Sequence, residues 1–244
     1  MIELFGLAVV VFTGSLVQGT LGYGVGLISV PFFLLLHPSF VPAVPMLLAL
    51  PPIIMALVRD RTFVDVKSFA ILTLGRLPGT LAGGVLLYLL SDLGVRLLAA
   101  GIFVFVAILT VFGVRGALTG NTGKVLAGGL SGFMATTTGV GGPILALSFR
   151  DADPRRMRGT LNATTLLGAL LSLTVVLMAG RLGSGELIGA AKLLLPAIAG
   201  IIASTAIGKY LQKEHISVIV DLSILLSCLA VVCQAAFELM QLAG

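Results

Sequence analysis

Long apolar runs, separated by short stretches of charged residues, glycine and proline, cover almost the whole chain. They define eight segments, at residues 2–36, 41–58, 66–90, 94–114, 124–149, 160–180, 187–208 and 216–240. The runs do not alternate between apolar and polar residues, so they predict helices rather than the strands of a barrel. Most of them have the roughly 20 residues that a helix needs to cross a bilayer core of about 30 Å. The pattern predicts an all-α integral membrane protein.

Composition agrees with a lipid environment. Of the 244 residues, 58% are hydrophobic and 10% are charged, whereas about a quarter of the residues in soluble domains are charged. The net charge of +5 comes from Lys and Arg residues scattered through short loops, which indicates a topology signal and excludes nucleic acid as an expected partner. The only cysteines, Cys228 and Cys233, have no metal-ligand spacing, and we expect neither a metal ion nor a cofactor.

Two of the segments contain a glycine-rich break. The stretch GSLVQGTLGYGVGLISVP at Gly14–Pro31 has a partner, GGLSGFMATTTGVGGP, at Gly128–Pro143, about 115 residues later. As one straight helix the first segment, residues 2–36, would be about 52 Å long, well beyond the bilayer core. The break therefore predicts a re-entrant hairpin with arms of about 13 and 10 residues, since irregular backbone is tolerated at membrane depth when protein surrounds it.

Loop charges distinguish two topologies. If all eight segments span the membrane, seven basic loop residues fall on each face; if the first and fifth segments are hairpins, eleven fall on one face and three on the other. Because cytoplasmic loops collect Lys and Arg, the second arrangement is favoured, with both termini periplasmic. It makes residues 1–116 and 117–244 two inverted-topology repeats in one membrane domain, each a broken hairpin plus three spanning helices. Eight plain transmembrane helices are the alternative.

The two breaks are the expected binding site. If they lie near the midplane, the second arm of each hairpin begins there with free N–H groups and the positive end of a helix dipole, a combination that binds anions. Close packing of glycine and threonine is the competing interpretation. The candidate residues in the breaks are Gln18, Gly19, Thr20, Gly22, Tyr23, Gly24 and Gly26 in the first, and Thr136, Thr137, Thr138, Gly139, Gly141 and Gly142 in the second.

Three polar residues outside the breaks are further candidates. Arg76 is the only basic residue well inside a predicted span, where a charge is costly and usually faces a cavity or a partner. It either attracts the anion or extends to the cytoplasmic interface. Asn162 and Thr165 share one helix face, and either line the site or form hydrogen bonds between helices.

The order of these elements resembles the sulfite exporter TauE/SafE family of small bacterial membrane permeases. Glycines followed by a proline carry the resemblance in each half, and PGTLAGGVL at 78–86 and PAIAGIIAS at 196–204 look like the family's paired third-span motif. The resemblance implies a transporter of the bacterial inner membrane that moves sulfite, thiosulfate or an organosulfonate by alternating access, with a homodimer left open as its assembly. The motif positions are Gly22, Gly24, Gly26 and Pro31, and Gly139, Gly141, Gly142 and Pro143.

Two other functions compete with transport. The sequence GLSG at Gly129–Gly132 matches the Gly-x-Ser-Gly of rhomboid-type intramembrane proteases, with Ser131 as the nucleophile. Such a serine needs a general base within hydrogen-bond reach, and both histidines, His37 and His215, lie in predicted loops, so we predict no enzyme. A membrane scaffold without transport is the third hypothesis, although loops this short leave little surface for soluble partners.

Overall fold

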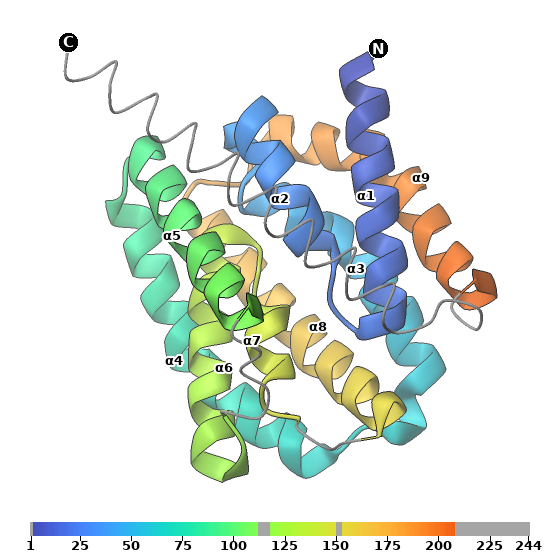
Figure 1. Ribbon diagram of the computed structural model, residues 1–244. Coiled ribbons are helices and arrows are strands. Elements are labelled where there is room, and N and C mark those ends of the chain that lie inside the picture. The colour runs from blue at the N-terminus through green and yellow to red at the C-terminus, as the bar shows by residue number, and fades with distance from the viewer. Residues whose placement is uncertain (1, 112–117, 150–152, 208–244) are drawn as a thin grey trace.

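The computed structural model describes residues 2–111, 118–149 and 153–207, which form helices joined by short connections (Figure 1). The all-α prediction is confirmed. The predicted last segment, at 216–240, lies outside the described residues. The α-helices are α1 (Ile2–Leu21), α2 (Val25–Leu36), α3 (Ala43–Asp60), α4 (Val66–Leu89), α5 (Asp92–Val111), α6 (Gly120–Thr138), α7 (Gly142–Ala146), α8 (Pro154–Met178) and α9 (Ser184–Ile207), and the short 3₁₀ helices η1 (Pro38–Phe40) and η2 (Arg61–Phe63) follow α2 and α3.

Several helices have the dimensions of membrane spans. Among the described residues, α1, α3 continued by η2, α4, α8 and α9 are long and apolar enough to cross a bilayer. Their outward faces carry large apolar side chains, such as Leu81 and Leu195, that are more than half exposed in the isolated chain. Lipid would cover these side chains, and the backbone polar groups are satisfied within the helices. The protein is a multi-pass membrane protein.

Helices α1 and α2 form a hairpin. After α1 ends at Leu21, the chain turns and α2 packs back against α1. The Glu3 carboxylate, in the first turn of α1, lies 2.9 Å from the His37 imidazole directly after α2, so the chain enters and leaves at the same end of the bundle. The first arm is longer than predicted, at 20 residues, because Gln18 to Leu21 continue the helix instead of interrupting it.

Helices α6 and α7 form the second hairpin. The Lys124 ammonium group, near the start of α6, lies 5.7 Å from the centre of the Phe149 ring, which follows α7. Helix α7 has only five residues, and the chain continues to Phe149 in tight turns whose N–H groups bond to carbonyls three residues earlier. The second arm of this hairpin is therefore mostly turn, whereas the second arm of the first hairpin is the 12-residue helix α2.

Contacts between loops group the charged residues at the two ends of the bundle. At one end, Arg156 at the start of α8 lies 3.1 Å from Asp65, which precedes α4. At the other end, Arg181 after α8 pairs with Asp92 at the start of α5. The two-hairpin topology puts both members of each pair at the same end, whereas eight consecutive spans would put them at opposite ends.

Asp65 organises the first of these ends. It caps α4 by accepting hydrogen bonds from the Ser68 hydroxyl at 2.7 Å and the Ser68 N–H at 3.3 Å, as N-cap residues commonly do. The hydrogen bond from the Ser68 hydroxyl is the main reason that the pKa of Asp65 lies below its usual value. Lys124 donates to the same hydroxyl at 2.6 Å, which ties the start of α6 to the start of α4.

Helices α4 and α9 share a length and a central proline, and each packs along a hairpin. Helices α4 and α9 both have 24 residues and carry a proline at their thirteenth position, Pro78 and Pro196. In space, α4 lies along α6 and α1 lies along α9 (Figure 1). The long helix with the central proline in each half thus covers the hairpin of the other half.

Glycines bring α4 and α6 into backbone contact. A Cβ atom on Gly79 would lie 1.9 Å from the carbonyl oxygen of Gly129, and one on Gly128 would lie 2.1 Å from that of Leu72. Such small-residue contacts are how membrane helices approach closely without a hydrophobic driving force. This interface holds the middle of α4, which carries Arg76, directly against the second hairpin.

Candidate functional site

The two glycine-rich breaks lie against each other inside the bundle. A Cβ atom on Gly26 would lie 2.2 Å from the carbonyl oxygen of Gly139, and one on Gly142 would lie 2.3 Å from the Cβ of Tyr23. Residues about 115 positions apart in the sequence therefore form a single region, as expected if both breaks contribute to one site.

The breaks are built by the same turn. Helix α1 is followed by Gly22 with φ of 90°, and α6 is followed by Gly139 with φ of 81°, a left-handed conformation that glycine adopts without steric cost. The Gly22 N–H donates to the Gln18 carbonyl at 2.9 Å, and the Gly139 N–H donates to the Ala135 carbonyl at 2.7 Å. Each glycine thus ends its helix in the usual way for a helix C-terminus.

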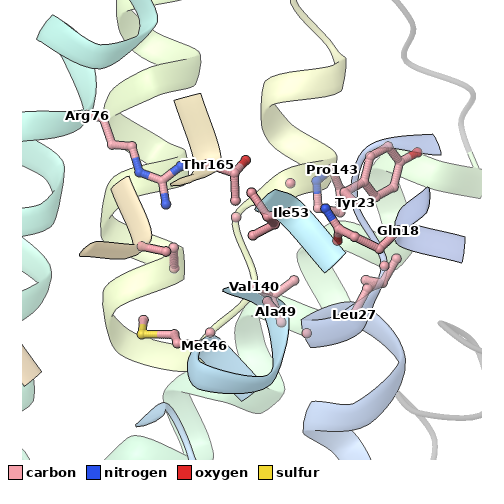
Figure 2. A pocket seen from close by; sticks show the side chains of 17 residues that line it. Gln18, Tyr23, Leu27, Met46, Ala49, Ile53, Arg76, Val140, Pro143 and Thr165 are labelled. Atoms are coloured by element: carbon pink, nitrogen blue, oxygen red, sulfur yellow. The ribbon is translucent and has the colours of Figure 1, made fainter. Parts of the chain in front are cut away.

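A small cavity lies between the breaks and helices α3, α4 and α8 (Figure 2). The volume of the cavity, counted as the positions that the centre of a water molecule can take, is about 50 Å³. One water needs about 10–15 Å³ on this measure, so the cavity has room for a few waters or one small anion. Its lining consists of Gln18, Tyr23, Gly24, Gly26, Leu27, Met46, Ala49, Ile53, Arg76, Ala135, Gly139, Val140, Gly141, Gly142, Pro143, Thr165 and Ala169.

Arg76 is the charged residue of this cavity. It is 1% exposed and therefore does not extend to the surface of the bundle. Glycines make room for it: a Cβ atom on Gly168 of α8 would lie 1.9 Å from its Nε, and one on Gly132 of α6 would lie 2.9 Å from its Cγ. Within the described residues, its Nε and Nη1 atoms have no hydrogen-bond partner. A buried cation left without a partner is very costly.

Other polar side chains lie around the cavity. Figure 2 shows Thr165 beside the guanidinium group, and Gln18 and Tyr23 on the opposite side. The Thr165 hydroxyl is buried and likewise has no hydrogen-bond partner among the described residues. One side of the cavity thus carries the positive charge of Arg76, while Leu27 and Ile53 contribute apolar surface.

Gln18 is fixed in place by two acceptors. Its Nε2 donates to the Gly22 carbonyl at 2.9 Å and to the Asn162 Oδ1 at 3.1 Å. Asn162 in turn donates from Nδ2 to the Arg158 carbonyl at 2.8 Å. Asn162 therefore supports Gln18 from behind and does not line the cavity itself.

An ion-pair cluster closes the end of the bundle beside the first break. Asp60, which is 3% exposed, lies 3.0 Å from Arg158 Nε and 3.2 Å from Arg59 Nη2. Arg59 also donates to the Gly19 carbonyl at 2.7 Å, and Arg158 donates to the Thr20 carbonyl at 3.4 Å. The cluster joins the ends of α3 and α1 to the start of α8.

Nine of the sixteen predicted site residues line the cavity, and the rest lie elsewhere. The hydroxyls of Thr136, Thr137 and Thr138 donate to carbonyls four residues earlier at 2.8–2.9 Å, because a threonine within a helix readily bonds its own backbone. Gly19 packs against Ser204 of α9, and the Thr20 hydroxyl bonds to its own helix. The remaining two, Gly22 and Asn162, shape the first break from outside the cavity.

The apolar part of the lining was not predicted. Leu27, Met46, Ala49, Ile53 and Val140 are indistinguishable in the sequence from residues that face lipid or a neighbouring helix. Pro143 was identified only as part of the glycine motif. Their positions depend on how α2, α3 and the second break meet, for which the sequence pattern holds no signal.

The protease hypothesis finds no support in the surroundings of Ser131. Its hydroxyl is buried and unpartnered among the described residues. His37 pairs with Glu3 and stacks on Phe40 at the open end of the first hairpin, and His215 lies outside the described residues. Ser131 is instead in close contact with Gly141 and packs behind the second break.

A cavity that combines polar and apolar groups, placed between membrane-spanning helices and lined by interrupted ones, is typical of a membrane transporter. Comparison with known families gives the more particular assignment. The chain belongs to the sulfite exporter TauE/SafE family, whose model it matches over residues 7–231, as the glycine motifs predicted. Comparisons with curated proteins and with solved structures gave no match. Membership in this family identifies the protein as a transporter and argues against the enzyme hypothesis.

Proposed function

We propose that the protein transports a small sulfur-containing anion, such as sulfite, thiosulfate or an organosulfonate, and binds it in the cavity between the two breaks. One observation carries this proposal: Arg76 is a fully buried cation, on the cavity wall, with hydrogen-bond donors left unused among the described residues. An anion in the cavity would supply the missing partner for this buried charge.

The first break adds to the attraction. Helix α2 begins at Val25, directly at the cavity, and has 12 residues. Its first N–H groups have no acceptor within the helix, and its dipole favours negative charge at this end. Gly24 and Gly26 line the cavity, and the space that side chains would fill there is occupied by neighbouring backbone, including the Gly139 carbonyl, so these glycines let the two breaks pack together beside the helix start. Helix α7 is too short to act in the same way, so the anion would be bound by one helix terminus and Arg76 rather than by two opposed termini.

Transport measurements with matched charge variants test the proposal. Purified protein in liposomes should give protein-dependent flux of labelled sulfite or thiosulfate, and Arg76→Gln should reduce it at least tenfold, since a hydrogen bond to a charged group contributes about 1.5–3 kcal/mol. Lys192→Gln removes the same charge from an exposed position in α9 and should leave the flux unchanged. Normal flux in Arg76→Gln would contradict the proposed site, and no flux of any anion would favour the scaffold hypothesis.

We also propose that residues 1–116 and 117–244 are inverted repeats in the cytoplasmic membrane of a bacterium, with both termini periplasmic, and that they alternate access to the cavity. The grouping of Arg156 with Asp65, and of Arg181 with Asp92, supports this topology. Accessibility labelling of single cysteines at Ser39 and Asp153, in a chain without Cys228 and Cys233, tests it. Ser39 should react from the periplasm and Asp153 from the cytoplasm, whereas eight plain spans require reaction from one side.

A further inference from the structure

The two amide hydrogens of Gln18 are both committed to the protein. One goes to the Gly22 carbonyl at 2.9 Å and the other to the Asn162 Oδ1 at 3.1 Å. The orientation of Asn162 is itself fixed, because its Nδ2 donates to the Arg158 carbonyl at 2.8 Å and only its oxygen can then face Gln18. Rotating the Gln18 amide would set its oxygen against two other oxygens.

Gln18 therefore presents its amide oxygen, a hydrogen-bond acceptor, to the cavity. It lines the cavity and is 3% exposed, and its Oε1 is the part of the amide not used by these hydrogen bonds. Figure 2 places it across the cavity from Arg76. An anion between the two would find a donor and a positive charge on one side, and on the other an oxygen that repels negative charge and accepts a hydrogen bond.

We infer that the cavity selects an oxyanion that carries one negative charge and one O–H group, so that for sulfite the bound species is hydrogensulfite rather than the dianion. This inference rests on the proposed function. Arg76 offers a single positive charge, and a second negative charge would be buried without compensation. The O–H group would donate to Gln18 Oε1, while the charged oxygens bond to Arg76. Gln18 is then a specificity residue, and Asn162 is the positioning residue that holds its amide.

The other charged groups around Gln18 are already engaged. Arg59 and Arg158 bond to Asp60 and to the carbonyls at the end of α1. Tyr23 shares the cavity wall with Gln18 and carries an ionisable hydroxyl. A probe that does not itself titrate near neutral pH controls for all of these protein groups.

Methanesulfinate provides that control, because it replaces the O–H of hydrogensulfite by a methyl group and keeps the single charge. Binding of both anions to the purified full-length protein should be measured by calorimetry across neutral pH. At the acidic end of this range we expect hydrogensulfite to bind about tenfold more tightly than methanesulfinate, because it adds one hydrogen bond and gives Gln18 Oε1 a partner that methanesulfinate cannot supply. As the pH rises, affinity for total sulfite should fall with the fraction of hydrogensulfite, while affinity for methanesulfinate stays constant.

Two variants assign the preference to the amide. Gln18→Met should bring the affinity ratio of the two anions close to one, and Asn162→Leu should do the same by freeing the Gln18 amide to rotate. If neither variant folds, the affinities of the wild-type protein for the two anions across the pH series still test the inference. Equal affinity for both anions in the wild type, an unchanged ratio in a folded Gln18→Met protein, or tighter sulfite binding at higher pH would overturn the inference alone. Binding of neither anion would overturn it together with the proposed function.

Discussion

Gly168→Ala moves the Arg76 guanidinium group without removing its charge, and so tests whether its position matters. The new Cβ atom would lie 1.9 Å from Arg76 Nε and 2.2 Å from its Cζ, where ordinary contacts are 3.4–4 Å. The guanidinium must therefore shift by about 1.5 Å, and because the atoms that the new Cβ meets are at the far end of a flexible side chain, this shift costs the fold little. Loss of its charged hydrogen bond, worth about 1.5–3 kcal/mol, predicts anion binding about 10- to 150-fold weaker.

Anion affinity and thermal unfolding of the same purified protein measure this effect. Gly101→Ala in α5 is the matched control, because nothing lies within 4 Å of the Cβ that it adds, and it should leave affinity unchanged. A Gly168→Ala protein that unfolds at the normal temperature and binds the anion with wild-type affinity would refute the assignment of Arg76 to the binding site.

Three further predictions concern the fold. Gly79→Ala should destabilise the protein by about 1–3 kcal/mol, because its Cβ would meet the α6 backbone at 1.9 Å, whereas Gly101→Ala should be neutral or stabilising in the same unfolding assay. Asp60→Asn should lower the free energy of unfolding by about 3 kcal/mol, because it leaves two arginines without their carboxylate. Asp92→Asn, at a side chain that is 77% exposed, should lower it by less than about 1 kcal/mol. Equal losses of stability in the two variants would contradict the role of burial. The hydrogen bond from Ser68 lowers the pKa of Asp65 below its usual value of 3.8. The ionised Asp65 therefore contributes its full stabilisation above that pH, and this stabilisation is lost as the pH falls further. Asp65→Asn should remove this part of the acid sensitivity of unfolding, and an unchanged acid profile would contradict the assignment.

Helix positions were largely predictable from the sequence, because each apolar run is bounded by charged residues or by glycine and proline. The segment predicted at 66–90 is α4, Val66–Leu89, and the segment predicted at 187–208 is α9, Ser184–Ile207. The pairing of the two breaks was predictable because both halves carry a dense cluster of glycines followed by a proline.

Side-chain directions at the breaks were not predictable. The pattern identified Gln18 as a polar residue in a break, but the structure places it in the last turn of α1, held by Asn162 from α8. The hydroxyl of Thr137 bonds its own helix, although its sequence neighbourhood is as polar as that of Gln18. Whether such a group faces a cavity depends on the rotation of each helix about its axis, which long-range packing decides.

The position of the bound anion tests the central claim most directly. Selenite, the selenium analogue of sulfite, can be located by anomalous scattering in crystals of the protein. We expect one selenium peak in the cavity between the two breaks, with the selenite oxygens in hydrogen-bond contact with Arg76 and Gln18, and no peak there in Arg76→Gln. A peak elsewhere in the bundle, or an empty cavity at saturating selenite, would contradict the account.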